Sequence, residues 1–123
     1  MKKKIELEYT FRSSTKILFN RLSTASGLSE WFADNVTIKG DVYIFVWEGI
    51  EQRAKLLKSK DCEYIQFQWE DEDEDYFEFR ISEDDVTGES ALILTDFVEP
   101  DEEIDAIELW DAQINELKHV LGA

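Results

Sequence analysis

Hydrophobic and polar residues alternate near the start of the chain, in the pattern of a half-buried β-strand. The odd-numbered positions of residues 5–11 are apolar, and Glu6, Glu8 and Thr10 lie between them. Strand side chains point alternately to opposite faces, so this spacing predicts a strand with one apolar face.

Helical spacing follows this first strand. Ser13 and Ser14 are the candidate N-caps for a helix over residues 15–22. Gly27 is predicted to break that helix, and Ser29 to cap a second short helix that carries two aromatic residues.

Six further strands are predicted in the middle of the chain. Short turns separate them, including one at Gly40 and one at Gly49. The predicted strands are residues 36–38, 42–47, 51–58, 64–69, 76–81 and 91–98.

Apolar residues recur at steps of three and four after Pro100, which predicts a long amphipathic helix. Asp101 is its candidate N-cap, and Gly122 is expected to end it. Trp110 is the largest side chain on the apolar stripe and is expected to anchor the helix on the sheet. The predicted stripe consists of Ile104, Ile107, Trp110, Ile114, Leu117 and Leu121.

The order of these elements predicts an α+β fold. Consecutive strands joined by short turns pair in antiparallel fashion. At 123 residues the chain has the size of one domain, so a single domain over residues 1–123 is expected.

The charge distribution argues against several kinds of partner. Residues 1–60 carry 11 Lys/Arg and 7 Asp/Glu, whereas residues 61–123 carry 2 and 22, and the net charge is −16. Such a surface repels phosphate backbones and anionic lipids, so no nucleic acid is expected as a partner. No apolar run is long enough to cross a membrane, so no membrane insertion is expected and a cytoplasmic location follows by default.

Few residues offer recognisable chemistry. The acidic run at residues 70–75 lacks the glycine and ligand spacing of a calcium loop and is interpreted as a solvated hairpin turn. Cys62 lies between two carboxylates, which disfavour a reactive thiolate. His119 is the single histidine and lies in the last helical turn, where positive charge is favourable. We therefore predict no catalytic residue, no metal site and no cofactor.

An enzyme would need a buried acid or base. The candidates are Tyr43, Glu48, Arg53 and Asp96, and none of them forms a recognisable catalytic pair in the sequence. A non-enzymatic role is therefore favoured.

Several aromatic segments together carry a resemblance to a known superfamily. They are Leu28-Ser29-Glu30-Trp31-Phe32-Ala33, then Gly40-Asp41 followed by Tyr43, Phe45 and Trp47, then Gln66-Phe67-Gln68-Trp69, and finally Trp110 with Leu117 and Leu121. With the order of elements, these segments resemble the START-like (helix-grip, SRPBCC) superfamily over essentially the whole chain. Within it, the chain is similar to the branch of the activator of heat-shock protein 90 ATPase homologues. Because eukaryotic activators carry a further N-terminal domain, the resemblance implies a stand-alone bacterial-type member.

The resemblance implies a seven-stranded antiparallel sheet that grips the C-terminal helix, with two short helices closing one end of the groove. Members bind lipids, sterols, polyketides or plant hormones in this groove, and some are cyclases or hydrolases. The expected function is a binding module for a small apolar, lipid-like or polyketide-like molecule. Two alternatives are an enzyme of the cyclase or hydrolase type in the same groove and a chaperone-related interaction module that uses the acidic surface. The expected ligand-binding residues are Trp31, Phe32, Tyr43, Phe45, Trp47, Phe67, Trp69, Phe79, Trp110 and Ile114.

The strand over residues 42–47 is apolar on both faces. With its aromatic residues inside, Val42, Ile44 and Val46 point outward, where antiparallel sheets are normally polar. Either the two short helices cover them, through Leu18 or Leu22, or a second copy of the chain does, which would form a weak homodimer.

Overall fold

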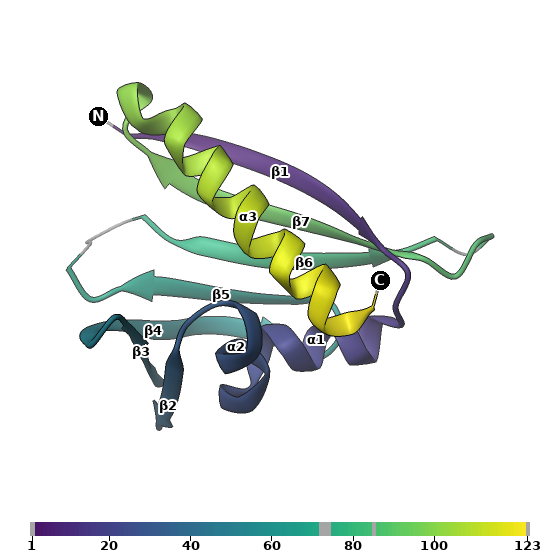
Figure 1. Ribbon diagram of the computed structural model, residues 1–123, viewed down its shortest axis with the longest axis horizontal. Helices are drawn as coiled ribbons and strands as arrows, with labels where there is room; N and C mark the ends of the chain where they lie inside the picture. Colours follow the sequence, from purple (N-terminus) through teal and green to yellow (C-terminus); the bar gives the residue numbers. More distant parts are fainter. Residues whose placement is uncertain (1, 72–74, 85, 123) are drawn as a thin grey trace.

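The computed structural model describes residues 2–71, 75–84 and 86–122. It contains seven strands and three α-helices, with a short 3-10 turn before the last helix (Figure 1). In chain order the elements are β1 (Lys3–Phe11), α1 (Thr15–Ser23), α2 (Ala25–Trp31), β2 (Asn35–Lys39), β3 (Val42–Trp47), β4 (Ile50–Lys60), β5 (Tyr64–Trp69), β6 (Phe77–Glu83), β7 (Ser90–Val98), η1 (Pro100–Glu102) and α3 (Glu103–Leu121).

All seven strands belong to one antiparallel sheet, in the order β1-β7-β6-β5-β4-β3-β2. The first strand therefore pairs with the last. The α3 helix crosses the sheet diagonally (Figure 1), and it packs against α2. These features confirm the predicted α+β, helix-grip architecture.

One face of the sheet is packed against the three helices. The alternation predicted for the strands holds, because Phe45, Phe67 and Phe79 are fully buried and join one hydrophobic cluster with residues of all three helices. We call this face the inner face, and the space between it and α3 the groove. Trp110 is 8% exposed, so it lies on the buried side of α3 as predicted.

The start of α3 differs from the prediction. The helix begins at Glu103, after the 3-10 turn, and its N-cap Glu102 makes no side-chain capping bond, so Asp101 is not the cap. Ile104 is 73% exposed rather than buried. The first turn of α3 lies beside the start of β1 (Figure 1), where the Lys3 ammonium group is 2.8 Å from a Glu103 carboxylate oxygen, and Ile104 there remains outside the hydrophobic cluster. The C-terminus agrees with the prediction, since Gly122 adopts φ +69° and caps the last turn.

The short helices also divide differently from the prediction. Of the two candidate caps, Ser14 is the N-cap of α1, through a 3.2 Å bond from the Ile17 N–H. However, α2 is capped by Thr24, and both Gly27 and Ser29 lie inside it. Gly27 therefore does not act as a helix breaker.

The acidic run joins β5 to β6, and residues 72–74 lie outside the described residues. Glu70 and Asp71 are exposed. The Asp75 carboxylate lies 3.9 Å from the Lys2 ammonium group.

The outer face of β3 is shielded within the chain. Ile44 is 7% exposed but lies outside the hydrophobic cluster, between its cross-strand neighbours Thr37 and Arg53. Leu18 and Leu22, the residues expected to provide a cover, are instead part of the inner cluster. Val42 and Val46 are half-buried.

Candidate functional site

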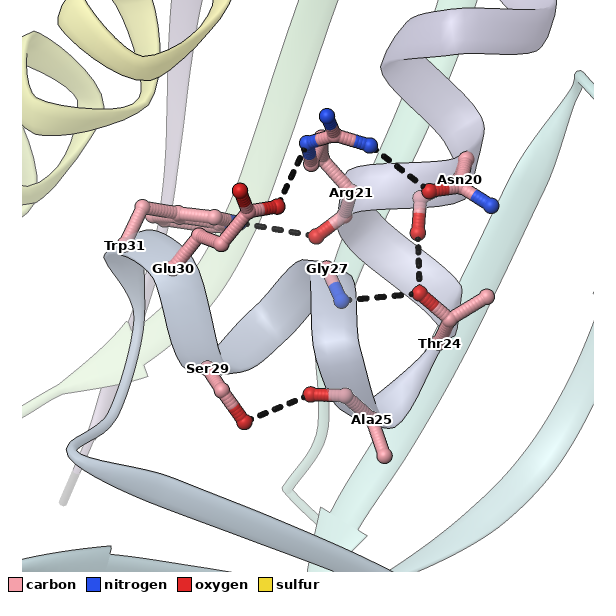
Figure 2. Close-up of polar contacts among 8 residues, drawn as sticks. All are labelled: Asn20, Arg21, Thr24, Ala25, Gly27, Ser29, Glu30 and Trp31. Carbon is pink, nitrogen blue, oxygen red and sulfur yellow. Dashed lines mark hydrogen bonds and ion pairs between the residues drawn. The ribbon is translucent and has the colours of Figure 1, made fainter.

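The junction of α1 and α2 lies at the end of the groove where the C-terminal half of α3 packs against α2 (Figure 1), and we call this the closed end. Hydrogen bonds hold the two short helices together there (Figure 2). The Thr24 hydroxyl accepts the Gly27 N–H at 2.9 Å and donates to the Asn20 carbonyl at 2.8 Å. A Cβ atom at Gly27 would lie 2.5 Å from the Asn20 oxygen and 2.7 Å from the Arg21 Cα. The missing side chain therefore allows the two helices to approach closely.

Two further contacts tie the end of α2 to α1. The Trp31 Nε1–H donates to the Arg21 carbonyl at 2.8 Å, and the Arg21 Nε lies 2.8 Å from a Glu30 carboxylate oxygen (Figure 2). The next residue, Phe32, is the C-cap of α2. The helix junction thus fixes the position of Phe32.

Phe32 is the centre of an aromatic cluster. Its ring stacks on Trp110 of α3 with a centroid separation of 5.8 Å, and it meets Trp47 of β3 edge-on at 5.2 Å. The Phe32 carbonyl accepts the Trp47 Nε1–H at 2.7 Å and the Gln113 amide N–H at 3.3 Å. Trp47 in turn lies 6.1 Å from Trp69 of β5. Rings of four elements therefore form a continuous chain.

This chain of rings borders a pocket of about 370 Å³ that is partly open to solvent. We call it the aromatic pocket. Its volume falls within the roughly 300–1,000 Å³ common for small-molecule sites. The lining residues are Phe32, Trp47, Gln52, Trp69, Asp96, Ala106, Leu109, Trp110 and Gln113.

Asp96 is the one charged residue among the described residues that line the aromatic pocket. It lies on the inner face of β7, paired with Ile5 of β1. One carboxylate oxygen accepts the Trp110 Nε1–H at 2.9 Å, and the other accepts the Phe97 N–H at 2.8 Å. These bonds orient the carboxylate and join β7 to α3.

The ten expected ligand-binding residues fall into two groups. Phe32, Trp47, Trp69 and Trp110 line the aromatic pocket. The other six are buried in the hydrophobic cluster and do not line it: Trp31, Tyr43, Phe45, Phe67, Phe79 and Ile114.

Asp96 was a candidate acid or base in the sequence, but four other lining residues were not anticipated from it. Gln52 lies on the inner-face parity of β4, and Ala106, Leu109 and Gln113 border the predicted stripe of α3. Their signal in the sequence is weak, because two are polar, one is small and one is 62% exposed.

The remaining acid–base candidates lie away from the pocket. The Tyr43 hydroxyl donates to the Ser23 carbonyl at 2.8 Å, and burial raises its pKa above the ordinary value. Glu48 is exposed in the β3–β4 turn with φ +51°, and the Arg53 guanidinium pairs with Glu51 at 3.0 Å. None of the three lines the aromatic pocket.

Other candidate chemistry is also absent from the pocket. Cys62 is half-buried in a turn and His119 is exposed. Among residues 2–71, 75–84 and 86–122, no cluster of three His, Cys, Asp or Glu side chains could hold a metal ion. In the same ranges no helix is long and apolar enough to cross a membrane.

A gripped C-terminal helix with a pocket beside it defines the helix-grip class. The chain belongs to the START-like superfamily, because the model of the START-like superfamily domain matches residues 1–123. The comparison with curated proteins gives no match.

Solved structures agree with this assignment. The solution structure of BfR322 from Bacteroides fragilis is 36% identical, with 98% of this chain and 91% of that chain covered and a TM-score of 0.71. The Aha1 dimer from Colwellia psychrerythraea is 16% identical, with coverages of 94% and 93% and a TM-score of 0.81. Protein MLL2253 from Mesorhizobium loti is also 16% identical, with coverages of 98% and 97% and a TM-score of 0.81. The two more distant structures support the fold alone.

Proposed function

We propose that this protein is a binding module for a small molecule with an apolar body, held in the aromatic pocket. The observation that carries the proposal is the unfilled volume of about 370 Å³ beside three tryptophan residues. Proteins pack their interiors densely, so large rings that leave such a space are characteristic of a ligand site. Membership of a superfamily whose members often bind hydrophobic ligands supports the same function.

The aromatic pocket suits a ligand that is only partly buried. Trp47 and Trp69 are half-buried, and Leu109 is largely exposed at the rim. A lipid-like or polyketide-like molecule would place its apolar part against the rings and leave another part in water.

A pair of alanines on α3 allows a direct test. Ala106 lines the aromatic pocket, whereas Ala112 is exposed on the same helix. We expect Ala106→Phe to fill the pocket and Ala112→Phe to leave it open. Native mass spectrometry of protein purified from its own host should show a retained small molecule in the wild type and in Ala112→Phe, but not in Ala106→Phe.

The contrary results are equally clear. A bound molecule that survives unchanged in a folded Ala106→Phe variant would place the ligand elsewhere. The binding function would be refuted by two results together. These are a wild type that retains no small molecule, and a thermal-shift screen in which no apolar compound stabilises the wild type.

A weak homodimer through the outer face of β3 is a separate, secondary proposal. It is supported by the half-buried Val42 and Val46, and the Colwellia structure is described as a dimer. The shielding of Ile44 within a single chain leaves little apolar surface for such a contact.

A further inference from the structure

We propose that the ligand of the aromatic pocket is a small organic cation, an amine or quaternary ammonium group attached to an apolar body. This inference rests on the proposed binding function and specifies the charge of the ligand.

The first support is the nature of the pocket walls. Rings of Trp69, Trp47, Phe32 and Trp110 follow one another around the pocket with centroid separations of 6.1, 5.2 and 5.8 Å. The faces of aromatic rings carry partial negative charge and attract cations, most strongly for tryptophan. Walls built from several such rings are the usual means of binding quaternary ammonium groups.

The second support is the supply of hydrogen-bonding groups. The indole N–H groups of Trp47 and Trp110 already donate to protein oxygens, at 2.7 and 2.9 Å respectively. They therefore have no proton to offer an anionic ligand. The Asp96 carboxylate lines the same pocket and places a negative charge on its wall, fixed in position by the bonds from Trp110 and Phe97.

The third support is the charge around the entrance. No Lys or Arg is among the described residues that line the aromatic pocket. A neighbouring hollow shares Gln52 and Trp69 with it and is lined by Glu51, Glu70 and Asp71. Arg53 also lines that hollow, but its guanidinium is paired with Glu51 at 3.0 Å.

The opposite side of the aromatic pocket has the same sign of charge. A second hollow shares Phe32, Trp47 and Gln113 with it, and its charged lining residues are Glu30, Asp34 and Glu116. A protein with net charge −16 and acidic side chains on both sides of the pocket attracts cations and repels anions.

Three soluble compounds of matched shape test the sign of the charge. Choline, 3,3-dimethylbutan-1-ol and 3,3-dimethylbutanoate each carry a head of three methyl groups on one central atom. Their net charges are positive, zero and negative, and the negative charge of the last lies on its carboxylate group. Each is titrated into the ¹⁵N-labelled protein, and the indole N–H signals are followed by NMR. We expect choline to shift the signals of Trp47, Trp69 and Trp110 saturably and to bind about tenfold more tightly than the neutral alcohol, and we expect no binding of the carboxylate.

Trp31 is an internal control, because its indole N–H donates to Arg21 and its ring does not line the aromatic pocket. Signals that all move together, Trp31 included, and return on addition of salt would mean diffuse attraction to an acidic surface and would overturn the proposal.

A pair of isosteric variants tests the role of Asp96. We expect Asp96→Asn to weaken choline binding about fivefold, with little change for the neutral alcohol, because the charge is lost; the single amide oxygen keeps the bond from the Trp110 N–H, and the bond from the Phe97 N–H is given up. Asp101→Asn removes the same charge from an exposed site outside the aromatic pocket and should leave both affinities unchanged.

The outcomes separate the two proposals. If the neutral alcohol binds at the same tryptophans as tightly as choline, the cation inference fails while the binding function stands. If choline does not shift these signals, the cation inference also fails, and the Ala106→Phe experiment then decides on the binding function independently.

Discussion

The groove has a closed end, at the junction of α1 and α2, and an open end, at the aromatic pocket. Both ends are built from β7 and α3, but they are filled differently. At the closed end, β7 presents Leu92, which is fully buried, and α3 presents Leu117, which is also fully buried. At the open end the same strand presents Asp96 and the same helix presents Trp110 beside Gln113. The change from branched aliphatic to polar and flat aromatic side chains coincides with the change from a packed core to a pocket.

Packing explains this difference. Aliphatic side chains on the sheet and on α1, α2 and α3 interlock at the closed end, and Leu18, Leu22 and Leu28 have no exposed surface. At the open end the sheet and α3 are bridged by rings that hydrogen-bond to fixed oxygens, through Trp47 to Phe32 and Trp110 to Asp96. Rings held in this way cannot turn to fill the space between them.

Truncating a fully buried ring and, separately, a half-buried ring of the aromatic pocket gives the largest expected effect. Phe79 is fully buried, and Phe79→Ala should lower the free energy of unfolding by about 3–5 kcal/mol. Trp69 is half-buried and already borders an unfilled space, so Trp69→Ala should cost less, about 1–2 kcal/mol. Urea unfolding of both variants measures the difference. Equal losses would mean that the rings of the pocket contribute to stability as core residues do.

Gly27→Ala tests the packing at the closed end, because two effects predict opposite signs for the change in the free energy of unfolding. Helix propensity alone would make alanine more favourable than glycine by about 1 kcal/mol inside a helix. The Cβ atom would lie 2.5 Å from the Asn20 carbonyl oxygen, which is backbone, so we expect a loss of about 1–3 kcal/mol instead. A thermal melt decides between them, and a stabilised variant would show that α1 and α2 do not need to approach so closely.

The strand pattern was predictable because it depends on local alternation. Positions such as Phe45 and Phe67 are inward in the structure as the sequence indicated. The role of Gly27 was not predictable, since its cause is contact with a neighbouring helix rather than its own backbone preference. Ile104 has the spacing of the apolar stripe but lies outside the hydrophobic cluster. Helical spacing gives the face on which a residue lies, and it does not say how far along the helix the core extends.

The aromatic pocket could be predicted only in part. Inner-face alternation identified Trp47 and Trp69 as candidates, and also Phe45 and Phe67 on the same strands. Whether a ring borders a pocket or fills the core depends on side-chain volumes from several elements at once. A residue such as Gln52 has no local feature that marks it as part of a pocket.

A tether between sheet and helix makes the groove sensitive to alkaline pH. The Tyr9 hydroxyl of β1 donates to the Asp111 carboxylate of α3 at 2.7 Å. Partial burial, followed by this hydrogen bond and the negative charge of Asp111, raises the pKa of Tyr9 well above its ordinary value of 10.0.

The sign of the pH dependence follows from proton binding. Above the ordinary tyrosine pKa the unfolded chain loses the Tyr9 proton while the folded chain keeps it, so stability should fall as the pH rises beyond about 10. Tyr9→Phe should be slightly less stable than wild type near neutrality and should show a shallower alkaline decline. Tyr43 contributes in the same direction, because burial raises its pKa as well. Unfolding free energies at about pH 8 and about pH 11 test this, and identical declines in wild type and Tyr9→Phe would rule out a contribution from the tether.

The smallest expected effect concerns the outer face, which the comparison of the two ends leaves aside. If the weak homodimer forms through β3, sedimentation equilibrium should show the average mass rising only at high protein concentration, because Ile44 is already shielded and little apolar surface remains. Val46 is half-buried on this face, so Val46→Lys should abolish the rise without entering the core. Thr10→Lys adds the same charge to the exposed outer face of β1, at the opposite edge of the sheet, and should leave the rise unchanged.

A wild type that stays monomeric at every concentration would end the homodimer proposal, and an equal response to both lysines would show that net charge rather than the β3 surface controls association. In either case the pocket, which lies on the inner face, should bind its ligand with the same affinity in Val46→Lys as in the wild type.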